Sequence, residues 1–452
     1  MAGMTGLGTQ TITSAGNAFK LATPDRYISL GDFINTVNKP DNRTQLIKTF
    51  GNQGITGFLQ LVGAVKTAGT ADEVQWWEEQ RLHPTANFTA TGTVTAAKNI
   101  TIPFTTSSSG NTFNLRVNDV VLWNSVQRAI VAAITSSTVT LSNLADATLS
   151  GAVSGIAYSL PVIGNLYGQG TDQPTQFLES NVVRRTNPYM IMKEIYKVTG
   201  SQATNIGWVD VGGGDYRWFI KGEADTRQRF IDKREMMLLL GQKVGNTTNV
   251  AAATYGGGSE GYFAAVEDRG MVHSGLVNTV AELDIIVKEF DKQGAGAEYA
   301  LYVNRDQDLA IDDMLATGIG TLSSNGVSGQ FGAFNNSADM AIKLGFKSFT
   351  RGGYTFHKHD WKLLNDPTLL GGSDFKGVAI PMSTVVDPQS GDRNPSLEIN
   401  YKSTNGYSRE MEHWMTGSFM GATNDTKDIA QFNYRSELAL VTRAANRHML
   451  IK

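Results

Sequence analysis

The chain has 452 residues, of which 39 are basic and 42 acidic, and its formal net charge is −3. The charges are mixed along the chain and form no lysine- or arginine-rich run, which argues against tight electrostatic binding of nucleic acid. The absence of cysteine excludes disulfides, thiol catalysis and cysteine-ligated metals. The length predicts two or three domains, and the 48 glycines indicate many turns.

The N-terminal stretch, up to about Tyr27, is polar, small and rich in threonine and glycine. It has no apolar period long enough to bury itself, so we expect an extended arm. It also lacks the charged and apolar regions of a signal peptide, and no apolar run in the chain approaches the ~20 residues that span a bilayer. We therefore expect a soluble protein made in a cytoplasm. Short helices are expected at Arg43–Phe50 and Ile55–Lys66.

The segment Thr89–Ala157 contains only five charged residues. The rest is mainly threonine, serine, valine, alanine and glycine in short alternating runs, which is typical of an all-β unit. Its flanks differ in kind, with Trp76-Trp77-Glu78-Glu79 before it and the helix-like Met190–Val198 after it. We predict a small β-domain inserted into a loop of a larger α+β host.

The middle of the chain predicts a polar, turn-rich return limb at Leu160–Asn187 and a mixed strand–helix stretch at Tyr189–Thr199. A strand is expected around Arg217–Ile220. A long helix follows at Gly222–Leu240, because acidic residues lie near its start and basic residues come later, as the helix dipole favours.

A second helix is expected at Thr279–Lys292, where Thr279-Val280-Ala281-Glu282 fits a capping box. A strand at Tyr299–Val303 leads into a third helix, Asp306–Ala316. The remainder predicts mainly strands: Lys347–His357, Val378–Ile380, Ser396–Tyr401 and a terminal run Phe432–Ile451.

Three motifs invite a chemical interpretation. Gly256-Gly257-Gly258-Ser259-Glu260-Gly261 satisfies G-x-G-x-x-G, but a dinucleotide site also needs the right strand before it and an acidic residue further on. We favour a flexible loop. Asp306-Gln307-Asp308 resembles a metal-binding D-x-D corner. Capping and negative charge at a helix start explain the same aspartates, together with Asn304.

His357-Lys358-His359 places two imidazoles on one face of a strand. A zinc site would need a further ligand, such as His413 or Glu412. No serine lies in a G-x-S-x-G elbow. We therefore predict no catalytic residue, no cofactor-binding residue, no metal site and no enzyme activity.

The order of these elements resembles that of the major capsid proteins of tailed bacteriophages. The segments that carry the resemblance are the helix Gly222–Gly241, the stretch Lys347–Phe356, and the ends Phe432–Leu440 and Ala444–His448. The chain is most similar to the capsid proteins of crAss-like phages, which also carry an insertion domain. Nothing marks a lysine–asparagine pair for cross-linking, and no charged helical scaffolding segment precedes the arm.

The resemblance implies an α+β, HK97-like capsid fold with an inserted all-β domain. Its parts, by residue number, would be the arm with short helices (1–60), the first limb of an extended loop (61–88), the inserted domain (89–157), the return limb (158–221), a peripheral domain with a spine helix (222–300), an axial domain (301–420) and returning C-terminal strands (421–452).

The resemblance also implies a structural protein that self-assembles into pentamers and hexamers of an icosahedral head around double-stranded DNA. Expected partners are further copies of the chain, portal and decoration proteins, and DNA by non-specific proximity, with no membrane. The expected location is a virion capsid assembled in the host cytoplasm. The alternatives are a metal-dependent glycosyl- or nucleotidyl-transferase using Asp306 and Asp308, or a virion tail or adhesin protein.

Overall fold

The computed structural model describes residues 58–79, 81–83, 85–105, 115–174, 182–205, 218–245, 247, 251–324, 347–386, 391, 393–418 and 424–452. The predicted arm and the helix expected at Arg43–Phe50 lie outside this part of the chain. Contacts divide the chain into two units: Met1–Asn52, Lys197–Ala224 and Gly417–Ala430 in one, and Gln53–Tyr196, Asp225–Thr416 and Gln431–Lys452 in the other. The seven-part division implied by the resemblance stays a prediction.

In the smaller unit, the described residues include the short helix α4 (Gly200–Ala203). Thr199 caps it, because its side chain accepts a hydrogen bond from the backbone N–H of Gln202. The Gly200 N–H donates to the carbonyl of Asp428, which joins α4 to the segment before β21.

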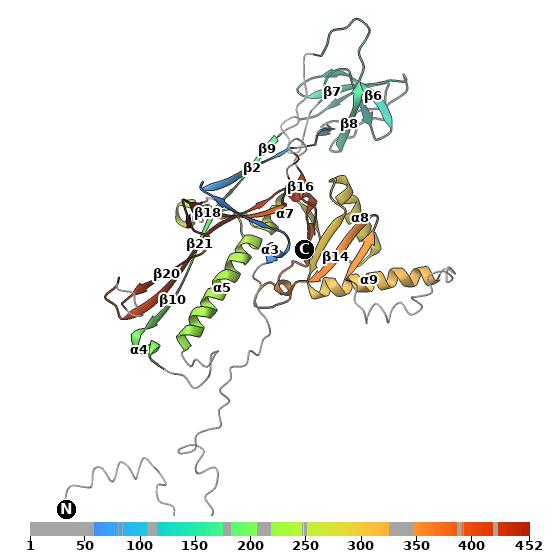
Figure 1. The fold of residues 1–452 in the computed structure, drawn as a ribbon. Coiled ribbons are helices and arrows are strands. Elements are labelled where there is room, and N and C mark those ends of the chain that lie inside the picture. The colour runs from blue at the N-terminus through green and yellow to red at the C-terminus, as the bar shows by residue number, and fades with distance from the viewer. Residues whose placement is uncertain are drawn as a thin grey trace, which may run out of the picture. The chain divides into compact units, whose positions relative to one another are not determined.

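A six-stranded sheet that lies mainly in the larger unit has the order β1-β18-β21-β10, with β19 paired to β18 and β20 paired to β21. Its strands are β1 (Val65–Gly69), β10 (Met190–Thr199), β18 (Leu397–Thr404), β19 (Tyr407–Ser408), β20 (Glu412–Gly417) and β21 (Ile429–Thr442). The long helix α5 (Trp218–Leu240) runs beside it, and its Phe230 ring lies 6.0 Å from that of Tyr434 (Figure 1).

A second six-stranded sheet has the order β11-β22-β15-β12-β14-β13. Its strands are β11 (Met271–His273), β12 (Glu298–Val303), β13 (Ser348–Arg351), β14 (Tyr354–Asp360), β15 (Gly377–Pro381) and β22 (Met449–Ile451). Helices α8 (Val280–Lys292) and α9 (Arg305–Ser324) cover one face, where Leu301 and Phe356 pack with Phe290 and Ile311.

Short elements complete the described chain: α3 (Phe58–Leu61), α6 (Ala252–Tyr255), α7 (Tyr262–Arg269), the 3-10 turns η1 (Lys362–Leu364) and η2 (Ala445–Arg447), and the strand pair β16 (Val385–Val386) and β17 (Arg393–Asn394). Two further strands, β2 (Glu73–Glu79) and β9 (Val182–Pro188), form an antiparallel two-stranded ribbon.

The low-charge segment forms a barrel with its own core. Its strands are β3 (Thr85–Thr89), β4 (Asn99–Pro103), β5 (Asp119–Trp123), β6 (Gln127–Ile134), β7 (Thr138–Asn143) and β8 (Ala157–Asn165), in the sheet order β3-β8-β5-β6-β7-β4. An isolated bridge between Ala90 and Phe104 joins the ends of β3 and β4 and closes the sheet at that point. Trp123, Val131 and Leu160 are fully buried inside it.

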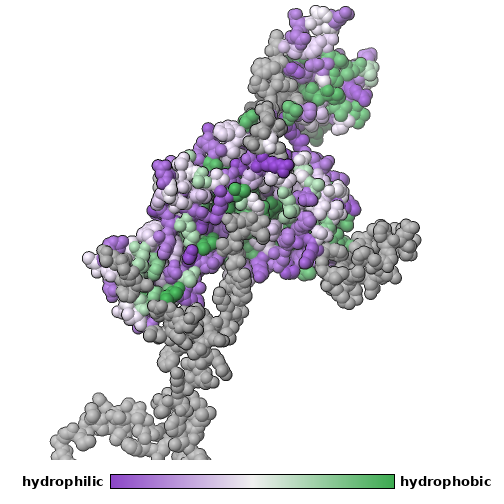
Figure 2. Space-filling model, in the orientation of Figure 1, coloured by the Kyte–Doolittle hydropathy of each residue, from purple (hydrophilic) through white to green (hydrophobic). Residues whose placement is uncertain are grey.

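The barrel includes more residues than the predicted insert 89–157, because β3 and β8 pair with each other from Thr85↔Pro161 to Thr89↔Ala157. Independent folding of this unit stays a prediction. Hydrophobic residues gather on the barrel face that Figure 2 shows.

Several predicted elements are confirmed. Helix α8 has the full capping box of Thr279 and Glu282, and β12, β15 and β18 match the expected strands within two or three residues at each end. The expected strand Lys347–His357 is instead a hairpin, because Gly352 and Gly353 adopt positive φ and turn the chain. The terminal run is broken at Ala444, which adopts φ 50°, and continues as η2 and β22.

Other predictions are wrong. Tyr189–Thr199 contains no helix: Met190–Thr199 is one strand whose burial alternates along its length, as the side-chain period of two requires. Residues 218–220 are helical, because α5 begins at Trp218. The helix expected to reach Lys66 ends at Leu61, since Gly63 at φ +92° turns the chain into β1.

Candidate functional site: an anchored ribbon

The two strands of the ribbon present two different faces. The register pairs Trp76 with Arg185 and Trp77 with Arg184. Because successive strand residues point to opposite faces, adjacent tryptophans have opposite environments. Trp76 is 6% exposed, whereas Trp77 is 64% exposed. We call the face that carries Trp77 the outer face of the ribbon.

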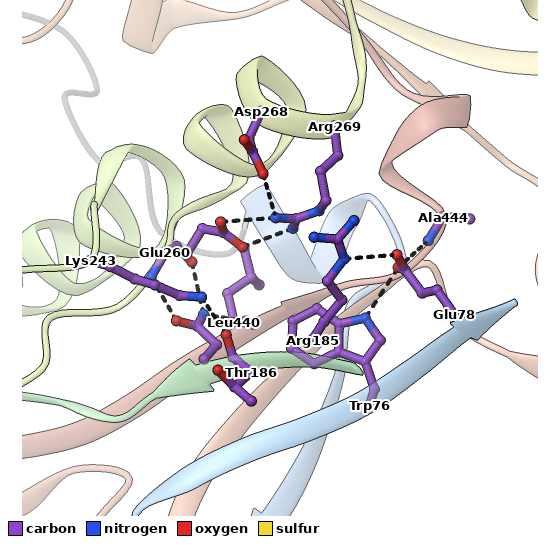
Figure 3. A network of polar contacts seen from close by, with 11 residues as sticks. Trp76, Glu78, Arg185, Thr186, Lys243, Glu260, Asp268, Arg269, Leu440 and Ala444 are labelled. Atoms are coloured by element: carbon purple, nitrogen blue, oxygen red, sulfur yellow. Dashed lines mark hydrogen bonds and ion pairs between the residues drawn. The ribbon is translucent and has the colours of Figure 1, made fainter. Parts of the chain in front are cut away.

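Asn187 joins the inner face of the ribbon to the body. Its side chain is fully buried and makes three hydrogen bonds. Its Nδ2 donates to the carbonyls of Leu440, at 2.6 Å, and Glu260, at 3.0 Å, while its Oδ1 accepts from the Glu260 N–H at 2.8 Å. The neighbouring Thr186 carbonyl accepts from Lys243 Nζ (Figure 3). One amide therefore connects β9 to β21 and to the turn before α7.

The Arg269–Glu260 ion pair reinforces this turn. The guanidinium NH1 and NH2 of Arg269 lie 3.0 and 2.8 Å from Oε1 and Oε2 of Glu260, and the two side chains are 10% and 13% exposed. Burial alone would lower the pKa of Arg269, but hydrogen bonding and attraction to Glu260 raise it above its ordinary value. The two parallel hydrogen bonds fix the plane of the guanidinium relative to the plane of the carboxylate.

Glu78 holds the other strand of the ribbon in the same way. Its Oε1 accepts from the Trp76 indole N–H at 3.1 Å and from the Ala444 N–H at 3.2 Å, and its Oε2 lies 3.5 Å from Arg185 Nε (Figure 3). Both strands are thus bonded to the body through polar groups that are largely removed from water. Such groups are costly to leave without partners, so the base of the ribbon is held in one position.

The outer face of the ribbon and its continuation carry large apolar side chains in contact with water. Besides Trp77, Val182 is 54% and Leu82 is 75% exposed. Arg184, opposite Trp77, is also exposed. Exposed tryptophan and arginine side chains are the residue types that most often dominate the energy of protein interfaces. This face is the best candidate for a protein contact surface among the described residues.

Asp306 and Asp308 lie in the first turn of α9, where the sequence predicted negative charge at a helix start. The cap is Asn304, whose Oδ1 accepts from the Gln307 N–H at 2.8 Å, so Asp306 is not the cap. Asp308 is paired through Oδ1 with Lys358 and through Oδ2 with Arg305, each at 2.8 Å.

The two histidines lie on one face of β14, but His413 and Glu412 lie on β20 in the other sheet. The His359 ring stacks on Tyr302 at 5.0 Å. Within the described residues, no three histidine or acidic side chains are grouped closely enough to hold a metal ion.

The glycine-rich motif precedes α7, but α6 and not a strand comes directly before it. Gly261 is required there because a Cβ would lie 2.5 Å from the backbone N of Gly241. Within the described part of the chain, none of the helices combines the length and apolarity that a bilayer crossing needs.

Sequence reasoning missed the residues that anchor the ribbon. Asn187 is more than 70 residues from Glu260 and Arg269, and although Glu260 lies in the glycine-rich motif, nothing in that motif points to a partner on β9. Only the alternation in Trp76-Trp77-Glu78-Glu79 held a signal, since it is compatible with a strand that has one buried and one exposed face.

Comparison with known proteins finds no matching family model and no matching curated protein. Solved structures do match. A capsid chain of cyanophage A-1(L) is 11% identical, with 93% of this chain and 98% of that chain covered and a TM-score of 0.45. The capsid of cyanophage P-SCSP1u gives 7% identity, 96% and 98% coverage and a TM-score of 0.41.

The capsid of a native GTA particle gives 9% identity, 94% and 98% coverage and a TM-score of 0.39. All three neighbours are capsid structures aligned over nearly the full length of both chains. With identities this low and TM-scores below 0.5, these matches do not by themselves assign a family or a function to this chain. None of the three is from a crAss-like phage, so that part of the resemblance stays a prediction.

Proposed function

We propose that this chain is a structural shell subunit, a major capsid protein whose copies assemble into the pentamers and hexamers of an icosahedral head around double-stranded DNA. It would act in a virion capsid, beside portal and decoration proteins, after assembly in the host cytoplasm. The observation that carries this proposal is the ribbon formed by β2 and β9, which is bonded firmly to the body at its base and presents Trp77 to water.

A lone two-stranded ribbon is at best marginally stable in water. The polar anchor at Asn187 and Glu78 holds this one in place, yet its outer face buries little against its own chain. A ribbon that is held in place and exposes a tryptophan suits a subunit that buries much of its surface against neighbouring subunits. An interface of standard size buries about 800 Å² per partner, so further surface beside the ribbon would have to take part in the contact.

The chemistry of the D-x-D segment supports the same proposal over the transferase alternative. Asp308 is already neutralised by two cations, and Asp306 points away from it on the helix surface. A divalent ion would have to displace Lys358, whose side chain is 5% exposed. The ion pair of Asp308 and Lys358 therefore suits a role in joining α9 to β14.

The test is substitution on the outer face of the ribbon. Trp77→Ala should leave the circular dichroism spectrum of the unassembled subunit unchanged and strongly reduce large assemblies in sedimentation velocity. Gln75→Ala is the matched control, because Gln75 lies on the same strand and the same face but is polar. Normal assembly of the Trp77→Ala protein would show that the ribbon is not an assembly surface.

A further inference from the structure

A hollow of about 860 Å³ lies on the face of the second sheet that α8 and α9 leave uncovered. Alternate residues of β12 separate the two faces: Leu301 packs against the helices, whereas Ala300 and Tyr302 line the hollow. His357 and His359 of β14 lie on the same side as Tyr302.

The hollow combines an apolar wall with basic groups. Met382, which follows β15, lines the hollow and is 57% exposed. Lys347, which precedes β13, also lines it, is exposed, and has no ion pair within the described residues. The two imidazoles add N–H donors. The acidic group there, Asp360, is already paired with Arg305 at 2.7 Å. The hollow therefore suits an aliphatic side chain that is flanked by carboxylates.

Helix α9 carries such a surface on its outer side. Asp306, Leu309 and Asp313 are spaced three and four residues apart, so they share one face of the helix. Leu309 is 55% exposed and both aspartates are exposed, while Ile311 and Met314 face the core. Neither of these two carboxylates has a hydrogen bond or an ion pair within the part of the chain that the structure describes.

We infer that the hollow receives the α9 face of a second copy of this chain, with Leu309 against Met382 and the aspartates toward Lys347 and the histidines. The hollow and the outer side of α9 lie on opposite faces of one sheet, so the α9 face of a chain does not reach the hollow of the same chain. Two different patches meeting head to tail form a ring when the rotation closes. This contact rests on the proposed function, because it joins neighbouring subunits of the shell.

The absence of cysteine makes a clean cross-linking test possible, since introduced thiols are the only ones present. Full-length Leu309→Cys and Met382→Cys proteins are mixed under assembly conditions and oxidised. We expect the yield of disulfide-linked dimer to be several-fold higher in the mixture than with either protein alone. The matched control replaces Met382→Cys with Val272→Cys, because Val272 is 48% exposed on β11, an edge strand of the same sheet.

Charge exchange gives a second, independent readout. Asp313→Lys and Lys347→Glu should each reduce association, and the two changes in one chain should restore it. Closed shells without the specific cross-link would overturn this contact and leave the proposed function standing, whereas no association under any condition would contradict both. If Lys347→Glu instead weakens retention of double-stranded DNA and no cross-link forms, the hollow faces nucleic acid and the inference fails.

Discussion

Removing the Glu260 carboxylate should destabilise the subunit, because it leaves the Arg269 guanidinium largely buried without its bidentate partner. The change is Glu260→Ala. The backbone N–H and carbonyl of residue 260, which bond to Asn187, remain in place. The substitution therefore isolates the ion pair from the amide anchor.

The expected size follows from burial. Breaking a buried ion pair by removing one partner costs about 3–5 kcal/mol. Here the side chains are 10% and 13% exposed, and Asp268 lies 3.3 Å from Arg269 NH1, so part of the charge stays compensated. We expect a loss of ~2–4 kcal/mol in the free energy of unfolding, about 1 kcal/mol below the range for fully buried pairs.

The assay is urea unfolding of the unassembled subunit, followed by tryptophan fluorescence. With a denaturant slope of about 3 kcal/mol per molar, the midpoint should fall by roughly 1 M. The matched control is Glu289→Ala, which removes the same side chain from the Lys292 pair, where the partners are 62% and 42% exposed. That change should cost under ~0.5 kcal/mol. Equal midpoints for the two variants would refute the reasoning from burial.

Four further outcomes are expected. Asn304→Ala should cost about 1 kcal/mol as loss of a helix cap, and Asp306→Ala much less, as measured by urea unfolding; the reverse order would contradict the assigned cap. Burial lowers the pKa of His448 to about 3, so unfolded chains bind a proton that folded ones do not between about pH 6.5 and pH 3. Stability should therefore fall by up to ~1.4 kcal/mol per pH unit as the pH drops through that window, and His448→Gln should flatten the slope in urea midpoints taken at pH 7, 6 and 5. Replacing residues 85–165 with a glycine–serine bridge should leave a folded body by circular dichroism, and aggregation of that protein would show that the barrel belongs to the body's core. Calorimetric titration with manganese should detect no tight site, and stoichiometric binding lost in an Asp306→Ala, Asp308→Ala variant would favour the transferase alternative.

Local signals predicted the elements whose determinants are close together in sequence. The capping box of α8 needs only Thr279 and Glu282, which lie three residues apart, and both bonds form. The barrel segment was visible because its low charge and alternating residues are themselves local properties. Its true edges were not, because β3 and β8 join the barrel by pairing with strands that are distant in sequence. Asn87 of β3 pairs with Ser159 of β8, 72 residues away, and β8 also pairs with β5.

The candidate site was not predictable in this way. Whether Trp76 or Trp77 is buried depends on Asn187, Glu260 and Ala444, which come from three distant segments. The mixed strand–helix prediction for Tyr189–Thr199 failed for the same reason. Its side chains suit either a helix or a strand, and pairing within the sheet β1-β18-β21-β10 selects the strand.

Electron microscopy of the full-length protein, expressed alone and with the other head proteins of its source, tests the shell proposal most directly. We predict closed particles, or rings of five and six copies, in which the ribbon of each subunit contacts a neighbour through Trp77. A protein that stays monomeric in every one of these conditions, while folded by circular dichroism, would contradict the proposal.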